Sequence, residues 1–174
     1  MFNKILVPLD GSVLAERALP RVLDLARQGL VNKVILLNVV KLKLRLTDIP
    51  LNELGIGMGM DTAPQWHEEL GRNRDYLTSM EFQLRSQGLK VESVLLEGRH
   101  PARDIAKFAQ ESDIDLILVA SHGYTGLKRM LFGSVAAKVI QKARVPVFLI
   151  REATAVSENV EYHTFMGKPA SHAA

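Results

Sequence analysis

The feature that most constrains the fold is a series of short, continuous apolar runs separated by stretches of helical periodicity. Four runs are rich in Val, Ile and Leu and one alternates more; in chain order they are Ile5–Leu9, Val34–Val40, Val91–Leu96 (the alternating one), Ile114–Ala120 and Val145–Ile150. Continuous apolar runs of this length are typical of strands covered on both faces, as in a parallel sheet. The sequence therefore predicts five buried strands.

Four helical patterns lie between these runs, at Ser12–Gln28, Gln65–Gln87, Pro101–Glu111 and Ser134–Ala143. Glycines that follow the first two patterns are usual stop signals, and Pro101 occupies the favoured first position of its helix. Pro20 lies inside the first pattern. We expect it to kink that helix, because proline lacks the backbone N–H.

The order of strands and helices predicts an α/β fold: an open five-stranded parallel sheet with helices on both faces. Right-handed crossovers favour strand order 3-2-1-4-5. In this order the first and fourth strands are neighbours, and the direction of winding reverses between them. Ligands of open α/β sheets bind at such a switch point, outside the carboxyl ends of the strands. The segments after Leu9 and after Val119 are therefore the candidates for a binding site.

Length and composition narrow the function classes. The 174 residues suit one domain, expected at 1–151, followed by a tail at 152–174 that is either loose or covers an edge strand or a partner. The absence of cysteine excludes disulfides and thiolate chemistry. No apolar run approaches the ~20 residues that cross a bilayer, and the first residues do not resemble a signal peptide. A net charge of +3 is too small for a nucleic-acid-binding signature. We expect a cytoplasmic protein that binds neither membrane nor nucleic acid.

The first candidate segment is Val7-Pro8-Leu9-Asp10-Gly11-Ser12. An acidic residue at the end of a buried strand is costly unless it has hydrogen-bond donors. Asp10 is therefore expected either to accept from an amino or hydroxyl group of a ligand, or to cap the following helix together with Ser12.

The second candidate segment runs from Ala120 through Gly123, Gly126 and Gly133 into a helix at Ser134. Glycine lets the backbone approach a phosphate closely, and the amino end of a helix offers free N–H groups and a positive dipole. This pattern favours anion binding. The alternative is a plain loop whose last glycine and serine cap the helix.

These segments resemble the universal stress protein family, of the type whose ATP-binding members carry G-x2-G-x9-G-(S/T). Here the register reads Ala120-x2-Gly123-x9-Gly133-Ser134. The similarity covers roughly residues 2–151 and includes VPLDGS near the start, Val34–Val39, Glu97–Ala102, Asp115–Val119 and Arg144–Val147. It implies an adenine nucleotide α-hydrolase-like fold.

The resemblance also implies how a nucleotide lies in the site. Asp10, beside Pro8 and Leu9, would meet the adenine or ribose, and Val39 would line the adenine pocket. Ala120 departs from the family pattern by replacing the first glycine, and its methyl group could narrow the approach to the ribose.

The phosphates would be held by backbone amides at Gly123, Gly133 and Val135 and by the Ser134 hydroxyl. His122 could touch a phosphate or be an ordinary, partly exposed loop residue. The histidines show no close-spaced pair, so no metal site made of protein ligands is expected. Mg²⁺ could still bind together with ATP, through its phosphates.

The function implied is that of an ATP-binding, stress-response regulatory protein, in which slow ATP hydrolysis or self-phosphorylation is a family property. No general base paired with a nucleophile is evident in the sequence. The alternative is an interaction module of the same fold that binds no nucleotide, for which Ala120 is the best support. The apolar edge strand at 145–150 is expected to pair with its copy in a twofold homodimer, as the resemblance also implies.

Overall fold

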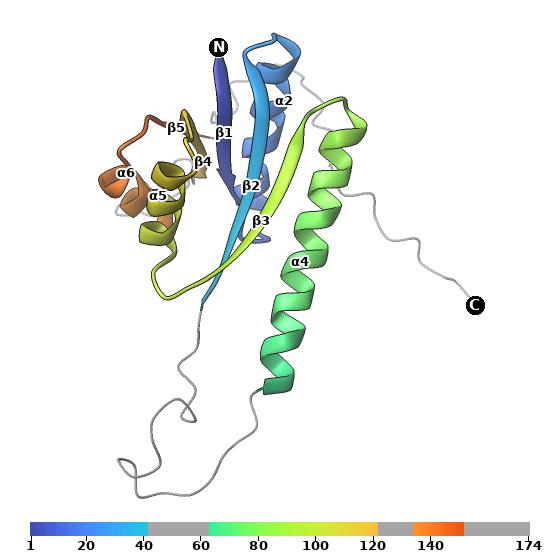
Figure 1. The fold of residues 1–174 in the computed structure, drawn as a ribbon, viewed down its shortest axis with the longest axis vertical. Helices are drawn as coiled ribbons and strands as arrows, with labels where there is room; N and C mark the ends of the chain where they lie inside the picture. The colour runs from blue at the N-terminus through green and yellow to red at the C-terminus, as the bar shows by residue number, and fades with distance from the viewer. Residues whose placement is uncertain (42–62, 122–133, 152–174) are drawn as a thin grey trace, which may run out of the picture.

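The computed structural model describes residues 1–41, 63–121 and 134–151 (Figure 1). The elements are β1 (Phe2–Pro8), α1 (Val13–Glu16), α2 (Ala18–Arg27), β2 (Val31–Lys41), α4 (Ala63–Ser86), β3 (Val91–Gly98), α5 (Pro101–Glu111), β4 (Leu116–Ser121), α6 (Ser134–Lys142) and β5 (Val147–Arg151). The strands form one parallel sheet in the order β3-β2-β1-β4-β5, which confirms the predicted topology.

Helices cover both faces of the sheet, as the apolar runs predict. Along β1, Ile5 and Val7 pack into the cluster that includes side chains of α2 and α4, whereas Leu6 packs into the cluster that includes side chains of α5 and α6. Figure 1 shows α5 and α6 on one side of the strands and α2 and α4 on the other. Successive side chains of a strand point to opposite faces, so a strand covered on both faces is apolar along its whole length.

The first helical segment differs from the single kinked helix expected at Ser12–Gln28, because it forms the two helices α1 and α2. In a continuous helix the N–H of residue 20 would donate to the carbonyl of Glu16, but Pro20 has no N–H. Helix α1 therefore ends at Glu16, and the N–H of Arg17 turns back to the carbonyl of Leu14 at 3.2 Å. Pro20 falls in the first turn of α2, where backbone N–H groups need no partner within the helix.

The remaining boundaries lie close to the expected ones. Helix α5 has the predicted bounds, β2 begins earlier at Val31, and β4 begins later at Leu116. Ile114 lies in the turn after α5, where its N–H donates to the carbonyl of Ala109 at 3.1 Å. The connection at 42–62 and the tail at 152–174 lie outside the described residues. None of the helices described is long and apolar enough to cross a membrane.

Candidate functional site

The pairing between β1 and β4 ends before the carboxyl ends of these two strands. The pairing of β1 with β2 continues to Pro8, but its pairing with β4 ends at Leu6 and Ile117. The N–H of Leu9 donates to the carbonyl of Leu37 in β2 at 2.8 Å, so the backbone nitrogen of residue 8 faces β4, where proline has no hydrogen to donate. Pro8 thus ends the β1–β4 ladder at the switch point, and the crevice in which ligands of this fold class bind begins there.

Asp10 has the capping role that was one of the two alternatives from the sequence, and the cap uses only one of its two carboxylate oxygens. Its Oδ1 accepts hydrogen bonds from the N–H and the hydroxyl of Ser12, at 3.0 and 2.5 Å. Ser12 in turn is the N-cap of α1 and accepts from the N–H of Ala15 at 3.2 Å. Asp10 is exposed, and its Oδ2 makes no hydrogen bond within the described part of the chain. The cap and a ligand contact are therefore compatible.

Asn38 fixes the end of β1 from the neighbouring strand. It is 4% exposed, and its Nδ2 donates to the carbonyl of Leu9 at 2.8 Å. The bond satisfies a buried carbonyl directly before Asp10, so Asn38 holds the turn that carries the carboxylate. Sequence reasoning did not single out Asn38, although a lone polar residue inside the apolar run Val34–Val40 was a usable signal.

Tyr76 links α4 to α1, the short helix that follows the turn. Its hydroxyl donates to Oε1 of Glu16 at 3.0 Å. Burial raises the pKa of Tyr76 above its ordinary value, and the negative charges of Glu16 and Asp10 raise it further. The tyrosine therefore stays a neutral donor. The carboxylates of Glu16 and Asp10 near this tyrosine suit ligand groups that donate hydrogen bonds better than ligand phosphates.

Val39 lies on the face of the sheet that α5 and α6 cover, and it packs against the apolar cluster there. Gly98, at the end of β3, lies beside it: a Cβ at position 98 would be 3.1 Å from Cγ1 of Val39 and would overlap Oδ2 of Asp104. That oxygen also accepts from the N–H of His100 at 3.1 Å, at the start of α5. The absence of a side chain at Gly98 therefore allows the β3–α5 turn to close against Val39.

The Ala120 methyl group packs against the cluster on the α2–α4 face, opposite to the face on which Val39 lies. The substitution of alanine for the family glycine therefore adds no volume on the face where α6 begins. Ser134 is the first residue of α6, and Val135 follows it; both are exposed. The backbone N–H groups of this first turn have no partner within the helix, and the helix dipole favours an anion there. The other predicted site residues, His122, Gly123 and Gly133, lie outside the described residues.

The turn that carries Asp10 follows β1, and Val39 lies near the end of β2, so both stand at the carboxyl edge of the parallel sheet; α6 begins at Ser134. No group of three or more His, Asp or Glu side chains in the described part of the chain could hold a metal ion. The strand order and the helices on both faces define a doubly wound α/β domain, a class of protein whose ligands bind at the switch point. The chain belongs to the universal stress protein family, since the model of that family matches residues 1–151.

Individual relatives agree with this assignment. The chain is 31% identical to universal stress protein MJ0577 of Methanocaldococcus jannaschii, over 87% of this chain and 96% of the relative, and 31% identical to universal stress protein YxiE of Bacillus subtilis, over 87% and 100%. A solved structure of MJ0577 superposes with a TM-score of 0.67 at 30% identity, covering 89% of this chain and 99% of that one. The universal stress protein of Archaeoglobus fulgidus in complex with dAMP gives 0.55 at 27% identity, covering 84% and 96%. The family and the fold class expected from the sequence are confirmed.

Proposed function

We propose that the chain binds an adenine nucleotide, ATP, in the crevice between β1 and β4, and that it acts as a cytoplasmic stress-response regulator. The observation that carries the proposal is the early end of the β1–β4 ladder at Leu6 and Ile117, which leaves the carboxyl ends of these strands unpaired with each other at the switch point. The dAMP complex of the Archaeoglobus fulgidus relative supports the choice of an adenine nucleotide.

In the proposed arrangement the base and ribose lie at the acidic end of the crevice and the phosphates at the amino end of α6. Oδ2 of Asp10 accepts from the adenine amino group or a ribose hydroxyl, with Pro8 and Leu9 beside it and Val39 as the apolar wall. The α6 amides at Ser134 and Val135 hold the phosphates, together with Gly123 and Gly133 by family resemblance. The proposal includes Mg²⁺ only as an ion that is bound to the phosphates of ATP.

The variant Asp10→Asn separates the capping role of this residue from ligand binding. Asparagine keeps the Oδ1 acceptor that Ser12 uses, but it replaces the free Oδ2 acceptor by a donor. We expect ATP affinity to fall about tenfold or more, since hydrogen bonds to charged groups contribute about 1.5–3 kcal/mol. The free energy of unfolding is expected to change by less than about 0.5 kcal/mol.

Isothermal titration with ATP, together with urea denaturation, measures both quantities. Asp24→Asn is the matched control, because Asp24 is a partly exposed residue of α2 whose carboxylate pairs with Arg21 at 3.2 Å, and it is not part of the proposed site. The control is expected to bind ATP like the unmodified protein. An unmodified protein that gives no saturable heat at millimolar ATP contradicts the proposal.

The rival proposal is an interaction module of the same fold that binds no nucleotide. Its best support in the sequence was Ala120, but the methyl group of this residue packs on the face opposite to Val39. Ala120→Gly is therefore expected to change ATP affinity by less than about threefold, which is a difference of about 0.6 kcal/mol. A gain of tenfold or more would show that the methyl group does obstruct the site. Native mass spectrometry of the purified protein decides between the two functions, because only the nucleotide-binding one predicts a co-purified ligand.

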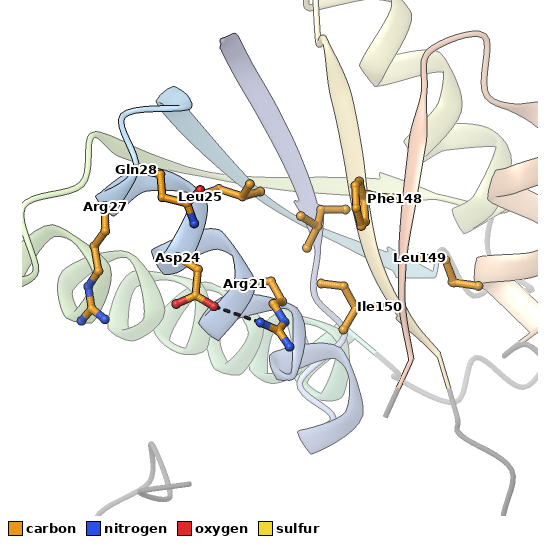
Figure 2. Close-up of a pocket in the computed structure, with 9 residues that line it drawn as sticks. Arg21, Asp24, Leu25, Arg27, Gln28, Phe148, Leu149 and Ile150 are labelled. Carbon is orange, nitrogen blue, oxygen red and sulfur yellow. Dashed lines mark hydrogen bonds and ion pairs between the residues drawn. The ribbon is translucent and has the colours of Figure 1, made fainter. Parts of the chain in front are cut away.

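We further propose that two copies pair through β5 in a twofold homodimer. Strand β5 is the edge of the sheet, paired only with β4 among the described strands, and Phe148 on it is 57% exposed. Phe148 and Ile150 line a hollow of about 540 Å³ beside Arg21 and Leu25 of α2 (Figure 2). An open edge strand with an exposed phenylalanine is a surface that pairing with a second chain would cover.

Phe148→Lys is expected to convert the dimer into a monomer, because it places a charge in the middle of the paired edge. The matched control is Phe82→Lys, where the phenylalanine is 74% exposed. Phe82 belongs to α4, which packs on β2 and β3, and β3 is the edge of the sheet opposite to β5. The control should remain dimeric. Light scattering at micromolar concentration gives both masses, and a monomeric unmodified protein contradicts the proposed dimer.

A further inference from the structure

Strand β3 is one edge of the sheet, and some of its backbone groups face away from β2. The N–H of Val34 in β2 donates to the carbonyl of Lys90 at 2.9 Å, at the start of the β2–β3 pairing. Successive residues of a strand direct their backbone groups to opposite sides, so those of Val91 and Ser93 point outward. Outward groups of an edge strand are a template on which another strand can pair.

Two side chains of α4 bind these outward groups. Nε and Nη2 of Arg85 donate to the carbonyl of Val91 at 3.0 and 2.8 Å. Oε2 of Glu81 accepts from the N–H of Ser93 at 3.0 Å and also from its hydroxyl. Glu81 and Arg85 lie one helical turn apart, and an ion pair of 2.6 Å joins them. The two side chains therefore act on the edge of β3 as one unit.

This pair makes the same hydrogen bonds that one residue of a further parallel strand would make. In a parallel ladder, a residue donates its N–H to a carbonyl of the next strand and accepts from an N–H two residues further along. Arg85 is the donor to Val91, and Glu81 is the acceptor from Ser93, two residues further along. The Glu81 side chain is only 18% exposed. A strand that pairs with β3 at this point must displace both side chains.

We propose that the outer edge of β3 is a latent pairing surface for the same edge of a second copy of this chain, and that Glu81 and Arg85 keep it closed. Two identical edges can satisfy each other about a twofold axis. Strand β3 has 8 residues, which is longer than β5 with 5, so its length suffices for such pairing. While the edge is closed, pairing between sheets is confined to β5. The inference does not depend on nucleotide binding.

The double variant Glu81→Ala/Arg85→Ala opens the edge, because it leaves the Val91 carbonyl and the Ser93 N–H without their partners. The mass of the full chain, measured by light scattering at micromolar concentration, is expected to rise about twofold or more, since pairing adds at least one further copy. The rise should be larger at higher protein concentration. This expectation holds whether or not the unmodified protein pairs through β5.

The matched control is Glu68→Ala/Arg72→Ala. It removes the same two side chain types, at the same spacing, from the same helix, where Arg72 and Glu68 are 3.5 Å apart and both are 69% exposed. Net charge and helix propensity therefore change equally in the two double variants. The control is expected to keep the mass of the unmodified protein. An equal rise in mass in both double variants overturns the inference, because the loss of an ion pair on α4 would then be sufficient.

Adding Ser93→Pro to the first double variant tests where the copies pair. Proline removes the outward N–H of residue 93, and an edge strand tolerates proline where the N–H faces away from the sheet. The triple variant should return to the mass of the unmodified protein. Proline restores none of the lost hydrogen bonds, so it would not rescue a protein that associates because it is partly unfolded. A triple variant that stays enlarged therefore overturns the inference.

Circular dichroism of each variant shows whether the fold is kept. A folded Glu81→Ala/Arg85→Ala protein with the mass of the unmodified one overturns the inference. If this variant does not fold, the single variant Arg85→Met takes its place, with Arg72→Met as its control. Arg85→Met frees the Val91 carbonyl but keeps Glu81 and the length of the side chain. It is expected to raise the mass at higher protein concentration, and an unchanged mass there overturns the inference.

Discussion

Asn38→Asp is expected to lower the free energy of unfolding by about 3–5 kcal/mol at pH 8, which is the cost of a buried charge without a partner. The variant removes the Nδ2 donor and places a carboxylate against the carbonyl oxygen of Leu9, which has then lost its hydrogen bond from residue 38. At low pH the introduced carboxyl is protonated, and its O–H can donate to the same carbonyl. The destabilisation should therefore be clearly smaller at pH 4 than at pH 8.

The sign of this pH dependence follows from proton binding. The introduced carboxyl has a pKa of about 3.9 in the unfolded chain, and burial raises it in the folded protein. Between these two pKa values the folded state binds more protons than the unfolded state, so the free energy of unfolding falls as the pH rises. The loss begins near the unfolded pKa and is complete above the folded one. ATP affinity is expected to fall as well, because the turn that carries Asp10 loses its anchor.

Urea denaturation of the variant at pH 4, 6 and 8, each relative to the unmodified protein at the same pH, measures the effect. Asn32→Asp is the control: Asn32 is exposed at the start of the same strand, and its Nδ2 donates to Oδ1 of Asn3 at 3.0 Å. This change is expected to alter stability by less than about 0.5 kcal/mol and to show little pH dependence. If both variants lose the same stability at all three pH values, the buried hydrogen bond of Asn38 does not have the role assigned to it.

The fold could be predicted from the sequence because its main determinants are local. Continuous apolar runs identify strands buried on both faces, and the alternation with helices, together with right-handed crossovers, leaves few strand orders. The split of the first helix was harder to foresee. Pro20 predicted a disturbance there, but whether the helix bends or breaks depends on how the carbonyl of Glu16 and the N–H of Arg17 find other partners.

The candidate site was predictable only in part, because its remaining features are contacts between distant segments. Asp10 and the glycine pattern stand out as motifs. The pairs Tyr76–Glu16 and Asn38–Leu9 join residues 60 and 29 positions apart, and no local pattern connects them. The direction of the Ala120 methyl group likewise depends on which face of the sheet each element covers. The sequence therefore indicates where in the fold a site is expected, but it does not indicate these contacts between distant segments.

Gly98→Ala is expected to lower the free energy of unfolding by about 2–3 kcal/mol, from overpacking and from a lost hydrogen bond. The added methyl group would overlap Oδ2 of Asp104, which must then give up its bond from the N–H of His100. The same methyl group would lie 3.1 Å from Cγ1 of Val39. Since Val39 is the proposed wall of the adenine pocket, we expect the affinity for ATP to fall about tenfold.

Gly71→Ala in α4 is the matched control, because a Cβ at position 71 meets no atom within 4 Å. Alanine is the better helix former, so this variant should gain up to about 1 kcal/mol and bind ATP normally. Urea denaturation should therefore show a loss of stability for Gly98→Ala and a gain for Gly71→Ala, although both substitutions add the same methyl group. Titration with ATP should show weaker binding only for Gly98→Ala.

Combining Gly98→Ala with Asp104→Ala separates the two contacts of the new methyl group. The overlap with the carboxylate is removed and the contact with Val39 remains, so stability should recover in part while ATP affinity stays low. Full recovery of affinity in the double variant would mean that Gly98 acts through Asp104 and not through the wall at Val39.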